Sequence, residues 1–206
     1  MSMAFIESIR DELAEDMWGR RVMNNSARAM YVERMVLRAI QIADAAAGWR
    51  YSGGDWLGWD IDSLETKVRV EVKASAARHS WSTEKSKPSR AAFDIAKRDR
   101  YYLTGEDLRI CPAEWNGRPA DIYVFAWHAD TDLKMMDQRS PDGWTFLIVR
   151  ARDLPDKKTA GLVTLRKCMA AEVRYDKLGV TGTEIAASLG SVKSSLAGAV
   201  ADLADI

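Results

Sequence analysis

Two kinds of hydrophobic pattern alternate along this chain: helical spacing and strict period-two alternation. Helical spacing predicts one helix over 4–17 and a second that has Asn25 or Ser26 as its N-cap and ends near Gly48. A third helical segment covers 181–206, where Ala, Ser and Leu are frequent. Together with the strands described next, these helices predict an α/β fold with a helical C-terminal tail.

Period-two alternation predicts the strands. The clearest lies at 68–73, where three valines alternate with three charged residues, and it follows 59–62, where Trp and Ile alternate with two aspartates. The segment before them, 48–58, reads as an approach loop. Further strands are predicted at 90–95, 121–127 and 144–149. At the start of the second of these, Asp121 is expected to pair with Arg118.

The segments 59–62 and 68–73 predict a β-hairpin that turns around Glu65-Thr66. Residues whose numbers sum to 131 then face each other, so that Asp60 lies across from Glu71. Opposed residues on one face have Cβ atoms about 5 Å apart. Asp60 therefore faces another carboxylate, and a divalent cation is the usual remedy for such repulsion. The same register places Asp62 opposite Arg69, which predicts a structural ion pair.

Composition fits one domain with a substantial core. The chain has 206 residues, of which 47% are hydrophobic and 29% charged. Without an apolar run of about 20 residues or a signal-peptide pattern at the start, we expect no membrane partner. Cys111 and Cys168 form no CxxC motif, so we expect a cytoplasmic protein. His79 and His128 alone leave little for a zinc site or a catalytic triad.

Charge is balanced overall but unevenly distributed. Residues 67–100 contain ten Lys or Arg against four Asp or Glu, whereas 1–65 contains seven against eleven. The basic stretch begins at the predicted carboxylate site, where it could hold a phosphate-bearing substrate; the alternative is a solvated basic loop. Candidate nucleic-acid-binding residues in it are Arg78, His79, Trp81, Lys85, Lys87 and Arg90. Of these, Trp81 is the candidate for stacking on a base.

Phosphodiester hydrolysis needs a polarised phosphoryl oxygen, an activated water and positive charge where negative charge develops. Two carboxylates suit Mg²⁺, which keeps several waters and binds substrate phosphate. We therefore interpret Asp60 and Glu71 as candidate catalytic residues and metal ligands. Lys73, two residues from Glu71 on the same strand face, could orient or deprotonate the water or stabilise the transition state.

Asp60, followed after ten residues by Glu71-Val72-Lys73, resembles the signature of the PD-(D/E)XK phosphodiesterases, the restriction-endonuclease-like superfamily. Trp59 stands where that signature has proline. The resemblance implies a mixed β-sheet flanked by helices, with the metal site on a central pair of strands. Members often add a glutamate from the preceding helix, and Glu33 matches that position as a fourth catalytic residue.

Later segments extend the resemblance to a group of bacterial restriction-enzyme-like proteins. These segments begin at Glu71, Arg118 and Trp144, and the likeness covers most of 29–155. It implies a nuclease domain over 1–180, followed by the tail at 181–206, which either packs on the core or binds a partner.

The expected activity is therefore a Mg²⁺-dependent DNA endonuclease, in which Mn²⁺ could replace Mg²⁺. A role in restriction or phage defence would imply a homodimer for double-strand cuts and a partner methyltransferase. Two alternatives stay open. The first is a catalytically inactive nucleic-acid-binding or assembly protein on the same fold. The second is an interaction protein of a defence system that uses its Ala-rich tail.

Overall fold

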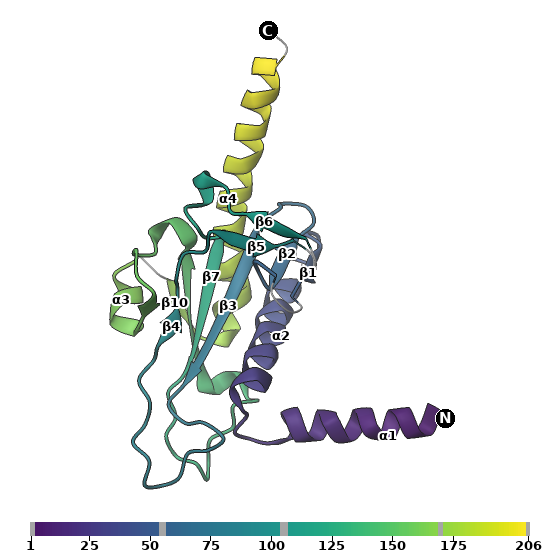
Figure 1. Cartoon of the computed structure of the whole chain (residues 1–206), viewed down its shortest axis with the longest axis vertical. Helices are drawn as coiled ribbons and strands as arrows, with labels where there is room; N and C mark the ends of the chain where they lie inside the picture. Colours follow the sequence, from purple (N-terminus) through teal and green to yellow (C-terminus); the bar gives the residue numbers. More distant parts are fainter. Residues whose placement is uncertain (1–2, 54–56, 104–106, 169–170, 205–206) are drawn as a thin grey trace.

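A six-stranded mixed sheet lies at the centre of the protein, with the strand order β1-β2-β3-β7-β8-β10 (Figure 1). The computed structural model describes residues 3–53, 57–103, 107–168 and 171–204, with side chains for all of these except 4 and 191–204. The strands are β1 (Trp49–Tyr51), β2 (Ile61–Ser63), β3 (Arg69–Ala76), β7 (Ile122–His128), β8 (Trp144–Arg150) and β10 (Ala171–Val173). Neighbouring strands are antiparallel, except that β3 and β7 run parallel.

Helices and two small sheets surround this sheet. The helical elements are α1 (Met3–Ala14), the π-helical turn η1 (Glu15–Gly19), α2 (Asn25–Ala43), α3 (Leu162–Arg166), α4 (Tyr175–Ala204), and the 3₁₀ turns η2 (Ala113–Trp115), η3 (Pro141–Gly143) and η4 (Ala151–Asp153). The small sheets pair β4 (Phe93–Asp94) with β9 (Thr159–Ala160), and β5 (Arg100–Tyr102) with β6 (Leu108–Ile110). Within the described residues, no helix has both the length and the apolar character to span a membrane. The α/β class, the mixed sheet and the C-terminal helix are thus confirmed.

The central sheet separates two hydrophobic cores. On one face, Val70 and Val72 pack with α2 and α4; on the other, Tyr123 and Phe125 pack with β4 and α3. The alternation on β3 therefore points its valines toward the helices and its charged residues toward the opposite face. Each fully buried aliphatic or aromatic side chain contributes roughly 1.5–3 kcal/mol, so these cores hold the sheet that carries the charged face.

The helix α2 begins one residue earlier than the sequence pattern predicts. Asn24 is its N-cap and accepts a hydrogen bond from the Ala27 N–H at 2.9 Å. The helix ends at Ala43, so Gly48 is not its C-terminal cap. Gly48 instead has a positive φ of 60° just before β1, and the predicted approach loop contains this strand. Residues 54–56 of that segment lie outside the described residues.

The C-terminal helix α4 begins at Tyr175, so the expected boundary between a core at 1–180 and a tail at 181–206 falls inside one continuous helix. Its first part packs against α2, with Leu178 and Ala186 buried in the shared core. The two helices approach closely at Gly179, where an added Cβ atom would lie 2.2 Å from the carbonyl oxygen of Ala39. Glycine is therefore required by the packing at this position. The helix continues along the body to Gly190, which lies close to Thr66, and beyond that residue α4 extends away from the sheet (Figure 1).

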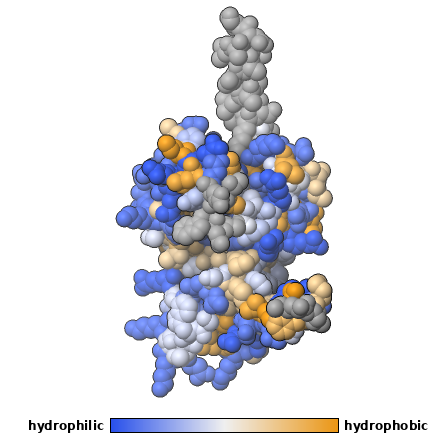
Figure 2. Space-filling view, turned by 45° about the vertical axis from the view of Figure 1, so that its right-hand side comes forward, coloured by the Kyte–Doolittle hydropathy of each residue, from blue (hydrophilic) through white to orange (hydrophobic). Residues whose placement is uncertain are grey.

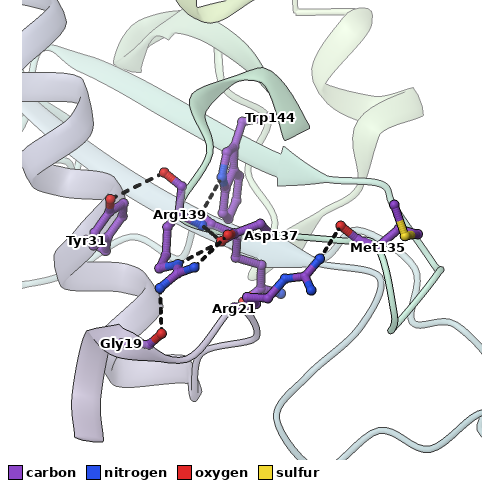
Figure 3. Close-up of polar contacts among 8 residues, drawn as sticks. Gly19, Arg21, Tyr31, Met135, Asp137, Arg139 and Trp144 are labelled. Carbon is purple, nitrogen blue, oxygen red and sulfur yellow. Dashed lines mark hydrogen bonds and ion pairs between the residues drawn. The ribbon is translucent and has the colours of Figure 1, made fainter. Parts of the chain in front are cut away.

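The loop between β7 and β8 anchors the N-terminal helical segment to the body (Figure 3). Arg139 donates hydrogen bonds to the Asp137 carboxylate and to the carbonyl oxygen of Gly19 at the end of η1. The Tyr31 hydroxyl of α2 donates to the carbonyl oxygen of Arg139 at 3.3 Å, and Arg21 donates to the carbonyl oxygen of Met135 at 2.9 Å. The end of η1 is thus held in place by side chains from distant parts of the sequence.

Candidate functional site

Asp60 lies where the β2–β3 hairpin opens. The register of this hairpin is confirmed, since Ile61 pairs with Val70 and Asp62 with Arg69. Strand β2 begins at Ile61, directly after Asp60, and the Asp60 carboxylate oxygen Oδ2 accepts the Val72 backbone N–H at 2.7 Å. This contact places the carboxylate directly beside the part of β3 that carries Glu71. The sheet therefore brings Asp60 and Glu71 together, as the sequence predicts.

Glu71 and Lys73 share the face of β3 opposite the helices. Their side chains form an ion pair between Lys73 Nζ and Glu71 Oε1. The Glu71 side chain is 15% exposed and that of Lys73 is 31% exposed, so the ion pair is partly buried but still accessible to solvent. The lysine thus stands next to the proposed ligand, where a cation can act on a bound phosphate.

Glu33 also reaches this region, although it comes from α2. Its Oε2 atom accepts a hydrogen bond of 2.8 Å from the hydroxyl group of Tyr51 on β1. The negative charge of Glu33 raises the pKa values of both Asp60 and Glu71, which shows that the three carboxyl groups interact electrostatically. Tyr51 is the residue that orients Glu33, and the sequence pattern did not single it out.

Burial and like charge act together on the proposed ligands. Burial raises the pKa of Asp60 well above its ordinary value, and Glu71 and Glu33 raise it further. Burial also raises the pKa of Glu71, although Lys73 opposes this shift. For Lys73, burial lowers the pKa, but the neighbouring carboxylates outweigh it and the net shift is upward. The carboxylates are therefore destabilised in their charged form, while the ammonium group is stabilised.

The donor set fits a hard divalent cation that keeps most of its water. Among the described residues, no group of three or more His, Cys, Asp or Glu side chains is arranged to hold a metal ion. One or two carboxylates, with waters and substrate phosphate completing the octahedron, are what Mg²⁺ commonly uses. A cation between Asp60 and Glu71 would also relieve the repulsion that raises the pKa of Asp60.

A cavity of about 430 Å³ opens beside these residues. Glu71, Lys73 and Tyr123 line its floor. Its other walls come from the segment after β4 and from strand β5, and they include Asp94, Arg98, Arg100, Tyr101 and Tyr102. Arg98 forms an ion pair with Asp94, and Arg100 is exposed. The cavity thus combines the carboxylate–lysine pair with two further cations and several aromatic rings.

Sequence reasoning missed the arginines and tyrosines of this wall. The signal was present, because Lys97, Arg98 and Arg100 cluster just before the pair Tyr101-Tyr102. The segment lacks strong alternation, so nothing in the pattern indicated that β5 and β6 would stand over the charged face of β3.

The six predicted nucleic-acid-binding residues lie elsewhere, on the loop that follows β3. Not one of them is among the described residues that line the cavity. Arg78 is buried and donates to the carbonyl oxygens of Thr131, Thr83 and Ser86, so its role is structural and its assignment to DNA binding is corrected.

The other five residues form an exposed or half-exposed basic loop. The His79 ring stacks on that of Trp81 with centroids 4.6 Å apart, and Trp81 is 63% exposed. Both rings thus offer a flat surface at the protein boundary. The exposed cations of this loop are Lys85, Lys87 and Arg90. These residues do not line the cavity that contains Glu71 and Lys73.

Two predicted ion pairs are wrong. Asp62 pairs with Arg50 of β1, with the Nε and Oδ1 atoms 2.7 Å apart, because β1 lies on its other side. Asp121 pairs with Arg69 instead of Arg118, because β3 and β7 begin side by side.

The Arg69–Asp121 pair is well ordered by its surroundings. Asp121 accepts hydrogen bonds from the Arg69 backbone N–H and from two nitrogens of its guanidinium group. The guanidinium group also lies 3.8 Å from the ring centroid of Trp115 and 5.2 Å from that of Trp59. This cluster holds the first residues of β3 against β7, two residues before Glu71.

The substitution Asp60→Asn should stabilise the metal-free protein at neutral pH. Because the pKa of Asp60 is raised in the folded protein, stability is lost as pH rises through that pKa, and the neutral amide avoids this loss while still accepting the Val72 N–H. At a Mg²⁺ concentration ten times its Kd, the wild-type Tm should rise by roughly 3–6 °C and the variant's should not. Thermal unfolding with and without Mg²⁺ tests both effects. Equal Mg²⁺ shifts in the two proteins would remove Asp60 as a ligand.

Comparison of the chain with models of known protein families, and with curated proteins, finds no match.

Proposed function

We propose that this chain is a metal-dependent endonuclease with a restriction-endonuclease-like fold that hydrolyses phosphodiester bonds of DNA. The observation that carries the proposal is the position of Asp60, whose carboxylate accepts a hydrogen bond from the Val72 N–H, between Glu71 and Lys73. Glu71 and Lys73 in turn line a cavity that also contains Arg98 and Arg100. Buried carboxylates of like charge are costly unless a cation or a proton neutralises them. Their presence beside a lysine favours a catalytic site over a structural ion pair.

The protein's own residues divide the work. A Mg²⁺ ion held by Asp60 and Glu71 would polarise a phosphoryl oxygen and lower the pKa of a bound water. Lys73 supplies positive charge next to Glu71, where negative charge develops on the phosphate. Glu33, oriented by Tyr51, adds a further carboxylate that can hold a water. Arg98 and Arg100 in the cavity wall would neutralise neighbouring phosphates.

The exposed basic loop after β3 supports a polymeric substrate. Lys85, Lys87 and Arg90 lie outside the cavity but on the same continuous stretch of chain as Lys73. A substrate that contacts both must extend over several phosphates, which a small phosphoester cannot do. A net charge of zero argues against non-specific coating of nucleic acid.

Cleavage of plasmid DNA tests the proposal. Purified protein should nick or linearise a supercoiled plasmid in Mg²⁺ or Mn²⁺, and EDTA should stop the reaction. Protein carrying Glu71→Gln, purified in the same way, controls for contaminating nuclease. A panel of methylated and unmethylated duplex, single strands and RNA then identifies the substrate. Cleavage of RNA alone would show that the substrate is RNA instead of DNA. Absence of cleavage throughout the panel would rule out the nuclease proposal.

The alternative is a nucleic-acid-binding protein that uses the same fold without catalysis. It is favoured by the ion pair of Lys73 with Glu71, which already neutralises one of the two proposed ligands. The two functions differ in metal binding. Calorimetric titration with Mg²⁺ should show binding that Asp60→Asn abolishes if the protein is an enzyme. DNA binding without any metal binding would favour the alternative.

A further inference from the structure

The N-terminal helix α1 projects from the body (Figure 1), and the large hydrophobic side chains described on it are exposed. Its exposed large hydrophobic residues are Met3, Phe5, Ile6, Ile9 and Leu13, each between 43% and 68% exposed. Three of them, Ile6, Ile9 and Leu13, recur at intervals of three and four and therefore form one stripe. Apolar side chains gather on this helix at the lower right of Figure 2. An exposed stripe of this kind marks an interaction surface.

The base of this helix is fixed at a second apolar surface. Helix α1 continues without a break into η1, because Ala14 has helical backbone angles. Trp18 of η1 donates to the carbonyl oxygen of Ala27, and Arg139 donates to that of Gly19. Since this end is pinned and the helix is continuous, α1 cannot fold back onto its own body without breaking the helix.

The surface at which Trp18 is pinned is a groove of about 600 Å³ on the outer side of α2. We call it the α2 groove, and its lining residues are Trp18, Met30, Tyr31, Arg34, Met35, Arg38, Arg139, Pro141 and Tyr175. Met30 is 42% exposed. The α2 groove is thus apolar at its floor, and a helix with an apolar stripe is the kind of partner it fits.

The charges of the α2 groove and of helix α1 are complementary. From Met3 to Gly19 the chain carries five carboxylates and one arginine. The α2 groove has three arginines and, among its described lining residues, no carboxylate; Arg139 is already paired with Asp137, whereas Arg34 and Arg38 form no ion pair with a described residue. Glu12 and Asp16 follow Ile9 and Leu13 by three residues and therefore border the stripe, so that they would face the arginines when a helix of this sequence lies in the groove. The surface is therefore complementary to α1 itself.

We propose that two copies of this chain form a dimer in which α1 of each copy lies in the α2 groove of the other. Such an exchange is symmetric, so both contacts form at once and each chain buries its stripe and its groove. The dimer rests on α1 and α2 and is independent of the carboxylate site.

Analytical ultracentrifugation of the full chain tests this proposal. Wild-type protein should sediment as a dimer at micromolar concentrations. The helix variant Ile9→Glu/Leu13→Glu and the groove variant Met30→Glu/Arg38→Glu should each raise the dimer Kd at least about 30-fold. The control variant Ile110→Glu/Val163→Glu changes residues that are 80% and 69% exposed elsewhere, and it should dimerise like wild type.

Mixing distinguishes the exchange from other arrangements. The helix and groove variants, each monomeric alone, should form a heterodimer, because one intact helix meets one intact groove. A groove variant that still dimerises like wild type would show that α1 packs against another α1, and a wild-type protein that stays monomeric at 100 µM would show that α1 does not bind a second copy. Either result overturns the proposal. Circular dichroism melting of each variant confirms that the chain remains folded.

Discussion

Replacing Lys73 by alanine should reduce the rate of plasmid cleavage by roughly 100- to 1,000-fold, because it removes positive charge from the place where the phosphate gains negative charge. Lys73 lies beside Glu71 on the same strand face and lines the cavity. Binding of DNA should change little, since the arginines of the cavity wall and the basic loop remain. Single-turnover cleavage and a separate binding assay measure the two quantities.

A matched control for this experiment lies on the neighbouring strand. Asp62→Asn removes a charge two residues from Asp60, but Asp62 pairs with Arg50 of β1 and does not reach the cavity. Its cleavage rate should stay within a few-fold of wild type. If Lys73→Ala and Glu71→Ala, made together, leave cleavage unchanged while Asp62→Asn lowers it, the assignment of the site is wrong.

Replacing Asp121 by alanine should lower the free energy of unfolding by about 3–5 kcal/mol, because it leaves the Arg69 guanidinium group without its carboxylate. The two side chains are only 11% and 15% exposed, so water cannot replace the lost hydrogen bonds fully. For a domain of this size, that loss corresponds to a decrease in Tm of roughly 10 °C. Urea unfolding followed by tryptophan fluorescence measures the change.

The ion pair of Arg166 with Glu172 provides the comparison, because it also joins an arginine to a carboxylate through two hydrogen bonds but lies at the surface. Glu172→Ala should leave the free energy of unfolding close to that of wild type, since solvent-exposed pairs contribute little. Equal losses in the two variants would mean that burial of the Arg69–Asp121 pair is not what makes it important.

The hairpin that carries the candidate site could be predicted because its determinants are local. Alternation assigns each residue to a face, and a turn of fixed length sets the register, so the pairing of Ile61 with Val70 followed from the sequence alone. The helix glutamate, Glu33, was predicted from the resemblance to the PD-(D/E)XK signature. These features depend on residues within about 40 positions of one another.

The partners of the charged residues could not be predicted because they come from distant segments or from strands too short to show a period. Arg69 meets Asp121 only when β3 and β7 pair in parallel, and nothing local specifies that pairing. The contact of Asp62 with Arg50 was missed because strand β1, with three residues, is too short to show a period in the sequence. The positions of Arg98 and Arg100 in the cavity wall were missed for the same reason, since strand β5 also has only three residues.

The close contact at Gly179 links the last helix to the one that carries Glu33. A methyl group there would meet the backbone of α2, so any larger residue must push the two helices apart. Related chains that keep this arrangement should therefore retain glycine at this point of the terminal helix, even where the carboxylates have been lost. Such a landmark would identify relatives by the close packing of these two helices.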